Sequence, residues 1–199
     1  MDTEYRTKTG WLCLDFANTV DWHASDNPVE SLNKYADLIG WSAERGIISD
    51  DTKDVLLRKS EEKPIEAQAV LEKAREIREN IYQMLCDTAH GYPIKITDLK
   101  GFNKALAGML SHSRLAPYEG GLRWDWDPHS DELDSVIWPV VRSAVDLMTS
   151  EAIKRVGQCA DERCGWLFWD ASRNRSRRWC DMSDCGNRAK VRRFYAKSR

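Results

Sequence analysis

Four cysteines lie in two pairs near the carboxyl end of the chain, as Cys159-x4-Cys164 and Cys180-x4-Cys185, with a spacer of fifteen residues between the pairs. Zinc in a structural site is bound tetrahedrally, and thiolates on two short loops provide a complete set of four ligands. Such a closed set leaves no position for water. The spacing therefore predicts one structural Zn²⁺ and no Lewis-acid chemistry.

These cysteines could instead form disulfide bonds or be unconnected buried thiols. Disulfides need an oxidising compartment, but the chain starts Met-Asp-Thr-Glu, without a basic start followed by an apolar core and a cleavage site. We therefore expect a cytoplasmic protein with reduced thiols. The remaining two cysteines, Cys13 and Cys86, stand alone among apolar residues and are expected to be small core residues.

Charge is distributed unevenly along the 199 residues. Of 30 basic and 32 acidic residues, 11 and 5 lie from Cys159 onward, which gives this segment a charge of +6 and residues 1–158 a charge of -8. Lysine and arginine neutralise phosphates and release counterions, and arginine also binds guanine bidentately. We expect DNA to contact nine of these side chains: Arg173, Arg175, Arg177, Arg178, Arg188, Lys190, Arg192, Arg193 and Lys197.

The same charge asymmetry is compatible with different roles. The arginines could pair with the acidic part of the chain and only dock the cysteine-rich segment to it, or they could bind another protein. RNA could replace DNA as the polymer. Arg188, three positions after Cys185, is as well placed to bond the zinc loop as to touch DNA, and Asn187 suits a tight turn into a helix.

The segment between the cysteine pairs has the pattern of a hairpin. An apolar run at 166–169 is followed by a polar turn at 170–175 and a return at 177–179. A helix is predicted from Gly186 to about Lys197, and its spacing brings Val191, Phe194 and Tyr195 together. We expect these three to face the core of the finger or the main domain.

These residues carry a resemblance to a known family. The string Cys180-Asp-Met-Ser-Asp-Cys185-Gly186-Asn187-Arg188-Ala-Lys190, preceded by Ser172-Arg-Asn-Arg-Ser-Arg-Arg-Trp179, resembles the CGNR zinc finger. Upstream, Trp11-Leu-Cys-Leu-Asp15-Phe-Ala-Asn18-Thr-Val20 and Leu38-Ile-Gly-Trp41 are similar to the start of the ABATE domain, described as a putative stress-induced transcription regulator. The resemblance implies a zinc-binding, DNA-binding regulator, with an ABATE-like domain at 1–154 and the finger at 155–199.

Helical periodicity dominates the first part of the chain. Helices are predicted at 31–41, 64–90, 97–110 and 131–156, with Asp50 or Asp51 as the cap of a further one. Residues 122–127 alternate with a strand period, and we pair them with 11–20 as a small sheet. The predicted fold is mainly α, a multihelical domain with a small β-sheet, plus a treble-clef-like four-cysteine zinc finger.

Catalysis has little support in this sequence. The four histidines are scattered, and neither a nucleophile elbow nor a phosphate-binding glycine loop is present. Asp15 and Asn18 are polar residues within an apolar run, so they could line a pocket for a small-molecule effector, or they could cap helices. No apolar stretch is long enough to span a bilayer. A homodimer is compatible with the sequence, but no heptad pattern predicts one.

Overall fold

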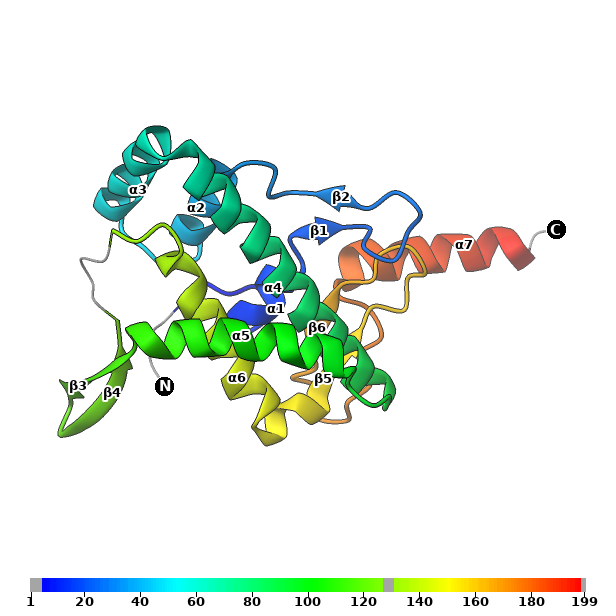
Figure 1. Ribbon diagram of the computed structural model, residues 1–199. Coiled ribbons are helices and arrows are strands. Elements are labelled where there is room, and N and C mark those ends of the chain that lie inside the picture. Colours follow the sequence, from blue (N-terminus) through cyan, green and yellow to red (C-terminus); the bar gives the residue numbers. More distant parts are fainter. Residues whose placement is uncertain (1–4, 127–130, 198–199) are drawn as a thin grey trace.

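A computed structural model describes residues 5–126 and 131–197 of the chain (Figure 1). Helices account for most of these residues. The α-helices are α1 (Leu12–Ala17), α2 (Tyr35–Glu44), α3 (Asp50–Glu62), α4 (Pro64–His90), α5 (Ile96–His112), α6 (Trp138–Met148) and α7 (Asn187–Lys197). Two 3-10 segments, η1 (Ser135–Ile137) and η2 (Glu151–Arg155), flank α6, and a π-helical turn, η3 (Met182–Gly186), precedes α7.

Strands form three antiparallel pairs. The pairs are β1 (Val20–Asp21) with β2 (Val29–Glu30), β3 (Arg114–Tyr118) with β4 (Gly121–Asp125), and β5 (Val156–Gln158) with β6 (Leu167–Trp169). The predicted fold class, mainly α with small sheets and a four-cysteine finger, is confirmed.

Helix α4 is the central element of the body. It runs from Pro64 to His90 as the sequence predicts, with proline in its first turn and Gly91 as a left-handed cap at φ +72°. One face is buried through residues such as Leu71 and Leu85. Helices α1, α2, α3 and α5 and strands β5 and β6 all contact it.

The expectation of a strand at 11–20 paired with 122–127 is wrong. Leu12–Ala17 is a helix whose six residues are all buried. A helix that is buried on every side has no hydrophobic period, so its sequence cannot be told from that of a buried strand. The segment Leu122–Asp125 lies in β4 and pairs with β3, while Asp127 is outside the described residues.

The predicted helix at 131–156 is also shorter than expected. It begins as η1, continues as α6 from Trp138, and gives way to η2 at Glu151. Pro139 explains the late start, because proline is tolerated in the first turn of a helix but not in its interior. Helix α3 is capped by Ser49, whose side chain accepts from the Thr52 amide, and not by Asp50 or Asp51.

The cysteine-rich segment shares its core with the helical body. Val156 of β5 and Leu167 of β6 are buried in the same cluster as Phe16 and Leu85. A second, smaller cluster contains Cys159, Cys164 and Cys185, with Trp166, Trp179 and Cys180 packed against it. Helix α7 follows this cluster and extends away from the rest of the molecule (Figure 1).

Candidate metal centre and basic surface

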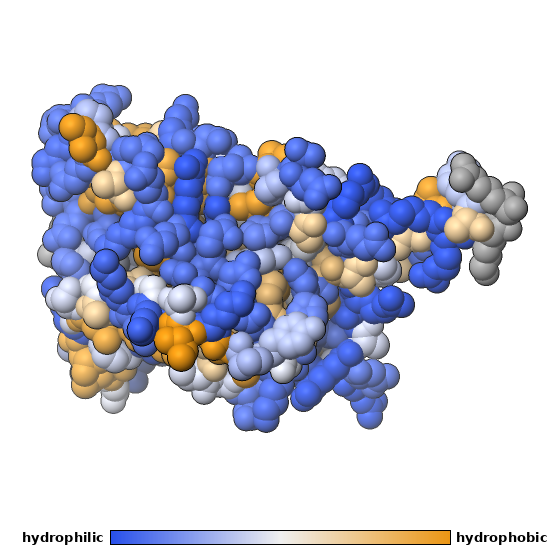
Figure 2. All heavy atoms as spheres, turned by 45° about the vertical axis from the view of Figure 1, so that its right-hand side comes forward, coloured by the Kyte–Doolittle hydropathy of each residue, from blue (hydrophilic) through white to orange (hydrophobic). Residues whose placement is uncertain are grey.

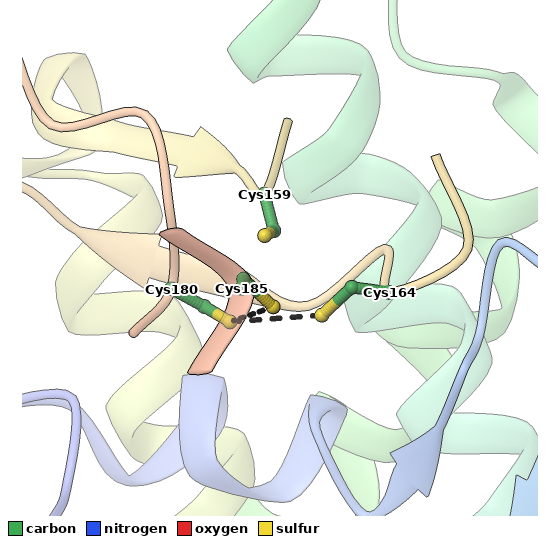
Figure 3. A group of neighbouring side chains, drawn as sticks. All are labelled: Cys159, Cys164, Cys180 and Cys185. Atoms are coloured by element: carbon green, nitrogen blue, oxygen red, sulfur yellow. Dashed lines mark hydrogen bonds between the residues drawn. The ribbon is translucent and has the colours of Figure 1, made fainter. Parts of the chain in front are cut away.

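The four predicted cysteines come together at one point. Cys159 follows β5, Cys164 precedes β6, and Cys180 and Cys185 lie just before and within η3. Their Sγ atoms all lie within 4.8 Å of one another, with 3.6 Å between Cys164 and Cys180 and 3.5 Å between Cys180 and Cys185. Figure 3 shows the four sulfurs pointing toward a common centre.

This arrangement fits a tetrahedral zinc site. Sulfurs bound at about 2.3 Å at the corners of a tetrahedron lie about 3.8 Å apart, close to the two observed separations. Hydrogen bonds with Cys164 and Cys180 lower the pKa of the Cys159 thiol. The bond between Cys159 and Cys164 has the opposite effect on its other member and raises the pKa of Cys164 to about 12. A divalent cation is required to hold four such neighbours as thiolates together. The residues therefore fit one structural zinc.

The hairpin predicted between the cysteine pairs is wrong in its position. Strand β6 pairs with β5, so the first cysteine pair lies in the turn of the hairpin. Residues 170–179 form a loop. Its backbone is held by Asp170, whose carboxylate accepts from the amides of Ser172 and Arg177 at 2.8 Å, and by the Arg177 guanidinium, which donates to the carbonyls of Trp169, Trp179 and Cys180. Side chains thus replace the strand ladder expected from the sequence.

The second cysteine pair is shaped by a capped turn. Asp181 accepts from the backbone amides of Ser183 and Asp184 at 2.6 and 3.2 Å. Asn187 donates to the Ser183 carbonyl at 2.8 Å, in agreement with its expected structural role. A Cβ on Gly186 would lie 2.5 Å from the Met182 sulfur, so only glycine fits directly after Cys185 without movement of that side chain.

Arg188 is bonded to the zinc site itself. Its guanidinium donates to Cys185 Sγ at 2.8 Å and pairs with Asp161 at 3.2 Å and with Asp184. Arg192 pairs with the same Asp161 at 3.0 Å. The Asp161 side chain is fully buried, so both arginines serve the finger. Arg188 also lies over the Trp22 ring, 4.6 Å from its centroid, and so contacts the helical body.

We expect Arg188→Gln to weaken zinc binding by about 10- to 100-fold, because groups that bond metal ligands orient them and stabilise their charge. Lys190→Gln is the matched control, since Lys190 is exposed and has no ion pair or side-chain hydrogen bond with the described residues. Competition with a chromophoric chelator measures both affinities. Equal affinity in the Arg188→Gln variant would contradict this role.

Eight of the nine predicted DNA contacts separate into two sets. Arg177, Arg188 and Arg192 are held by internal contacts, as described above. The Lys197 side chain is outside the described part. The other five are exposed, and within residues 5–126 and 131–197 they have no ion pair or side-chain hydrogen bond: Arg173, Arg175, Arg178, Lys190 and Arg193. Of these, Arg178 lies over the Trp179 ring at 5.5 Å.

The expectation that Val191, Phe194 and Tyr195 are buried is wrong. These side chains are 53%, 67% and 66% exposed. Helix α7 contacts the finger through Ala189, Arg188 and Arg192 near its start, and its remaining turns extend beyond the body. Figure 2 shows this projection with hydrophilic and hydrophobic residues side by side.

Asp15 and Asn18, the expected pocket residues, are both engaged inside the protein. The Asp15 carboxylate accepts from the amides of Lys8 and Thr9 and from the Thr9 hydroxyl, and it pairs with Arg45 at 3.0 Å. Asn18 donates to the Leu167 carbonyl and accepts from the Leu167 amide, both at 2.8 Å. Asn18 thereby joins α1 to β6, and we assign both residues a structural role.

Further contacts between the body and the finger have no obvious sequence signal. The Trp166 indole donates to the Val20 carbonyl at 2.9 Å, and the Tyr82 hydroxyl donates to the Gly165 carbonyl at 2.9 Å. The His23 amide donates to the Cys164 carbonyl at 3.0 Å. These partners lie far apart in the sequence, so neither spacing nor periodicity predicts them.

Comparison with known families agrees with this two-part structure. A model described as ABATE, putative stress-induced transcription regulator, matches residues 10–151, and the CGNR zinc finger model matches residues 155–198. The chain belongs to the ABATE family. The ABATE match covers the helical body, and the CGNR match covers the four cysteines and α7. A comparison with curated proteins finds no match.

The two families are described as a regulator and a zinc finger, not as enzymes. Among the described residues of the ABATE domain and of the zinc finger, no helix is both long enough and apolar enough to cross a membrane.

Proposed function

We propose that this protein is a transcription regulator that binds duplex DNA through its zinc finger. The observation that carries the proposal is the set of five exposed cations defined above, on the 173–178 loop and on α7. The family description supports regulation, and the basic finger supports a polyanionic partner. We place the protein in the cytoplasm, because zinc-binding thiols must stay reduced.

Helix α7 is the element that we propose to enter the major groove. It projects from the body (Figure 1), and its exposed positions include Lys190 and Arg193. At 100° per residue these two lie on the side opposite Arg188 and Arg192, which face the finger. The loop with Arg173, Arg175 and Arg178 would then contact the phosphate backbone.

The docking alternative is that the basic residues serve only to attach the finger to the acidic body. Several contacts between the two parts use neutral groups, such as Asn18 with Leu167 and Tyr82 with Gly165. The arginines that do reach the body, Arg163 and Arg188, lie over the Trp22 ring. Lys154 is the main cause of the lowered pKa of Glu151 in the body, and Arg175 adds only a minor electrostatic contribution. None of the five exposed cations forms an ion pair with the described residues of the body, and they therefore favour an external partner.

The test compares two double variants of the zinc-loaded protein. Lys190→Ala with Arg193→Ala should weaken binding to random duplex DNA and reduce the slope of log K against log salt by about 2, because each lost phosphate contact removes about 0.9. Lys100→Ala with Lys104→Ala, two exposed lysines of α5, changes the net charge equally. If both double variants behave alike, binding follows net charge and α7 is not the contact.

An effector site has a different candidate position from the one expected at Asp15 and Asn18. A cleft of about 490 Å³ between the β1–β2 loop and the first zinc loop is lined by Trp22, Asp26, Glu162 and Arg163, among others. Trp22 also contacts Arg188, which bonds Cys185, so a ligand here would act on the finger directly. Tryptophan fluorescence of the protein, compared with a Trp22→Phe variant during metabolite screening, tests this proposal. A signal that persists in the variant would place the ligand elsewhere.

A further inference from the structure

The β3–β4 hairpin projects from the body at the end opposite α7 (Figure 1). Its two-residue turn, Glu119 and Gly120, has φ of 41° and 80°, the left-handed conformation that suits a tight hairpin. The hairpin is a separate two-stranded sheet. Two-stranded ribbons are only marginally stable in water by themselves, so a further partner surface would stabilise this one.

One face of the hairpin is apolar and exposed. Residues directly opposite each other share a face, and the register pairs Leu115 with Trp124 and Pro117 with Leu122. Leu115, Leu122 and Trp124 are 56%, 67% and 44% exposed. Arg142 of α6 lies over the Trp124 ring at 5.0 Å and fixes that side chain near the base of the hairpin. Exposed apolar side chains in such a group indicate an interaction surface.

The two edges of the hairpin differ in their ability to pair. Strand β3 carries Pro117, which has no amide proton and blocks pairing of an edge strand. Strand β4 has no proline and no neighbour other than β3 in the described sheet. A further strand would therefore be added beside β4.

The sequence of β4 is complementary to itself. When two copies are antiparallel and Trp124 lies opposite Trp124 of the second copy, each Arg123 lies opposite an Asp125. The Asp125 carboxylate already accepts from Arg114 at 3.2 Å and has further acceptor capacity for a second guanidinium. A register centred on Arg123 would instead place the two arginines opposite each other, and like charges in this position are unfavourable.

We propose that two copies of this protein form a homodimer by antiparallel pairing of their β4 strands, centred on Trp124, into a four-stranded sheet. The interface is isologous, with Arg123, Trp124 and Asp125 of each β4 opposite Asp125, Trp124 and Arg123 of the other. Since α7 lies at the far end of each copy, the two zinc fingers are at the outer ends of the dimer and remain accessible.

The sharpest test reverses the charges of Arg123 and Asp125, one at a time. The dimer Kd is measured by sedimentation equilibrium on the zinc-loaded full chain. Arg123→Asp and Asp125→Arg each create two like-charge pairs, and each should raise the dimer Kd by about tenfold or more. An equimolar mixture of the two variants restores both opposite-charge pairs, and it should dimerise more tightly than either variant alone. Lys100→Ala, on α5, should leave the Kd unchanged.

A covalent test fixes the register. Trp124→Cys places two cysteines opposite each other, and their oxidation by a mild disulfide such as oxidised glutathione, which takes the two electrons and two protons, should give a disulfide-linked dimer on a non-reducing gel. Leu122→Cys is opposite Trp126 of the second copy and should link much less. A wild-type protein that stays monomeric at high micromolar concentration would overturn the proposal, as would a dimer that tolerates Arg123→Asp and does not link through residue 124.

Discussion

Replacement of Cys185 by serine is expected to release the zinc, unfold α7 and lower the melting temperature by roughly 10 °C. Structural zinc contributes roughly 10–16 kcal/mol of apparent binding free energy in small fingers. Loss of one thiolate should remove on the order of 4 kcal/mol of this binding free energy. In a chain of this size each kcal/mol lowers the melting temperature by about 2–4 °C. Metal content and differential scanning calorimetry measure both effects.

The loss should extend into the helical body, because β5 and β6 flank the first cysteine pair and their residues Val156 and Leu167 belong to the main core. Hydrogen exchange should therefore become faster around Val20 and Tyr82, which bond the finger at Trp166 and Gly165. Cys86→Ser is the control, since Cys86 lies on α4 outside the cluster. A Cys185→Ser variant with one zinc per chain and an unchanged melting temperature would contradict the four-cysteine site.

Asn18→Leu is expected to destabilise the protein by about 3 kcal/mol and to accelerate zinc extraction by a chelator. The variant leaves the buried amide and carbonyl of Leu167 without their partner, and each such group costs about 1–3 kcal/mol. Strand β6 begins three residues after Cys164, so its release should loosen the first zinc loop. Denaturant unfolding and chelator kinetics provide the two measurements.

Asn27→Ala is the matched control for Asn18→Leu, because Asn27 is exposed and surface changes of this kind stay within about 0.5 kcal/mol. If Asn18 lined an effector pocket instead, its replacement would leave stability nearly unchanged and abolish only ligand binding. A free energy of unfolding of the Asn18→Leu variant equal to that of the wild type would thus argue against a stabilising role of the Asn18–Leu167 hydrogen bonds between α1 and β6.

The sequence predicts features that depend on local spacing. The cysteine ligands follow from two x4 gaps, and α4 follows from a 3.6-residue period bounded by Pro64 and Gly91. Features that depend on distant partners are not predicted. Helix α1 is buried on all sides and has no period, and the loop at 170–179 is set by Asp170 and Arg177.

The basic finger illustrates the same limit. All nine cations are visible in the sequence. Which of them are held inside the finger and which are exposed depends on tertiary contacts, such as the pairing of the buried Asp161 with Arg188 and Arg192. The exposure of Phe194 and Tyr195 depends on how far α7 extends past the finger. An amphipathic pattern cannot distinguish a stripe that packs on its own protein from one available to a partner.

The proposal of DNA binding through the finger is tested most directly by a salt titration of the zinc-loaded full chain on random duplex DNA. Five exposed cations predict a slope of log K against log salt of about -4 to -5, with measurable binding at low salt. Absence of binding at low salt, or a slope near zero, would contradict the proposal and leave the finger as a structural element of the ABATE body.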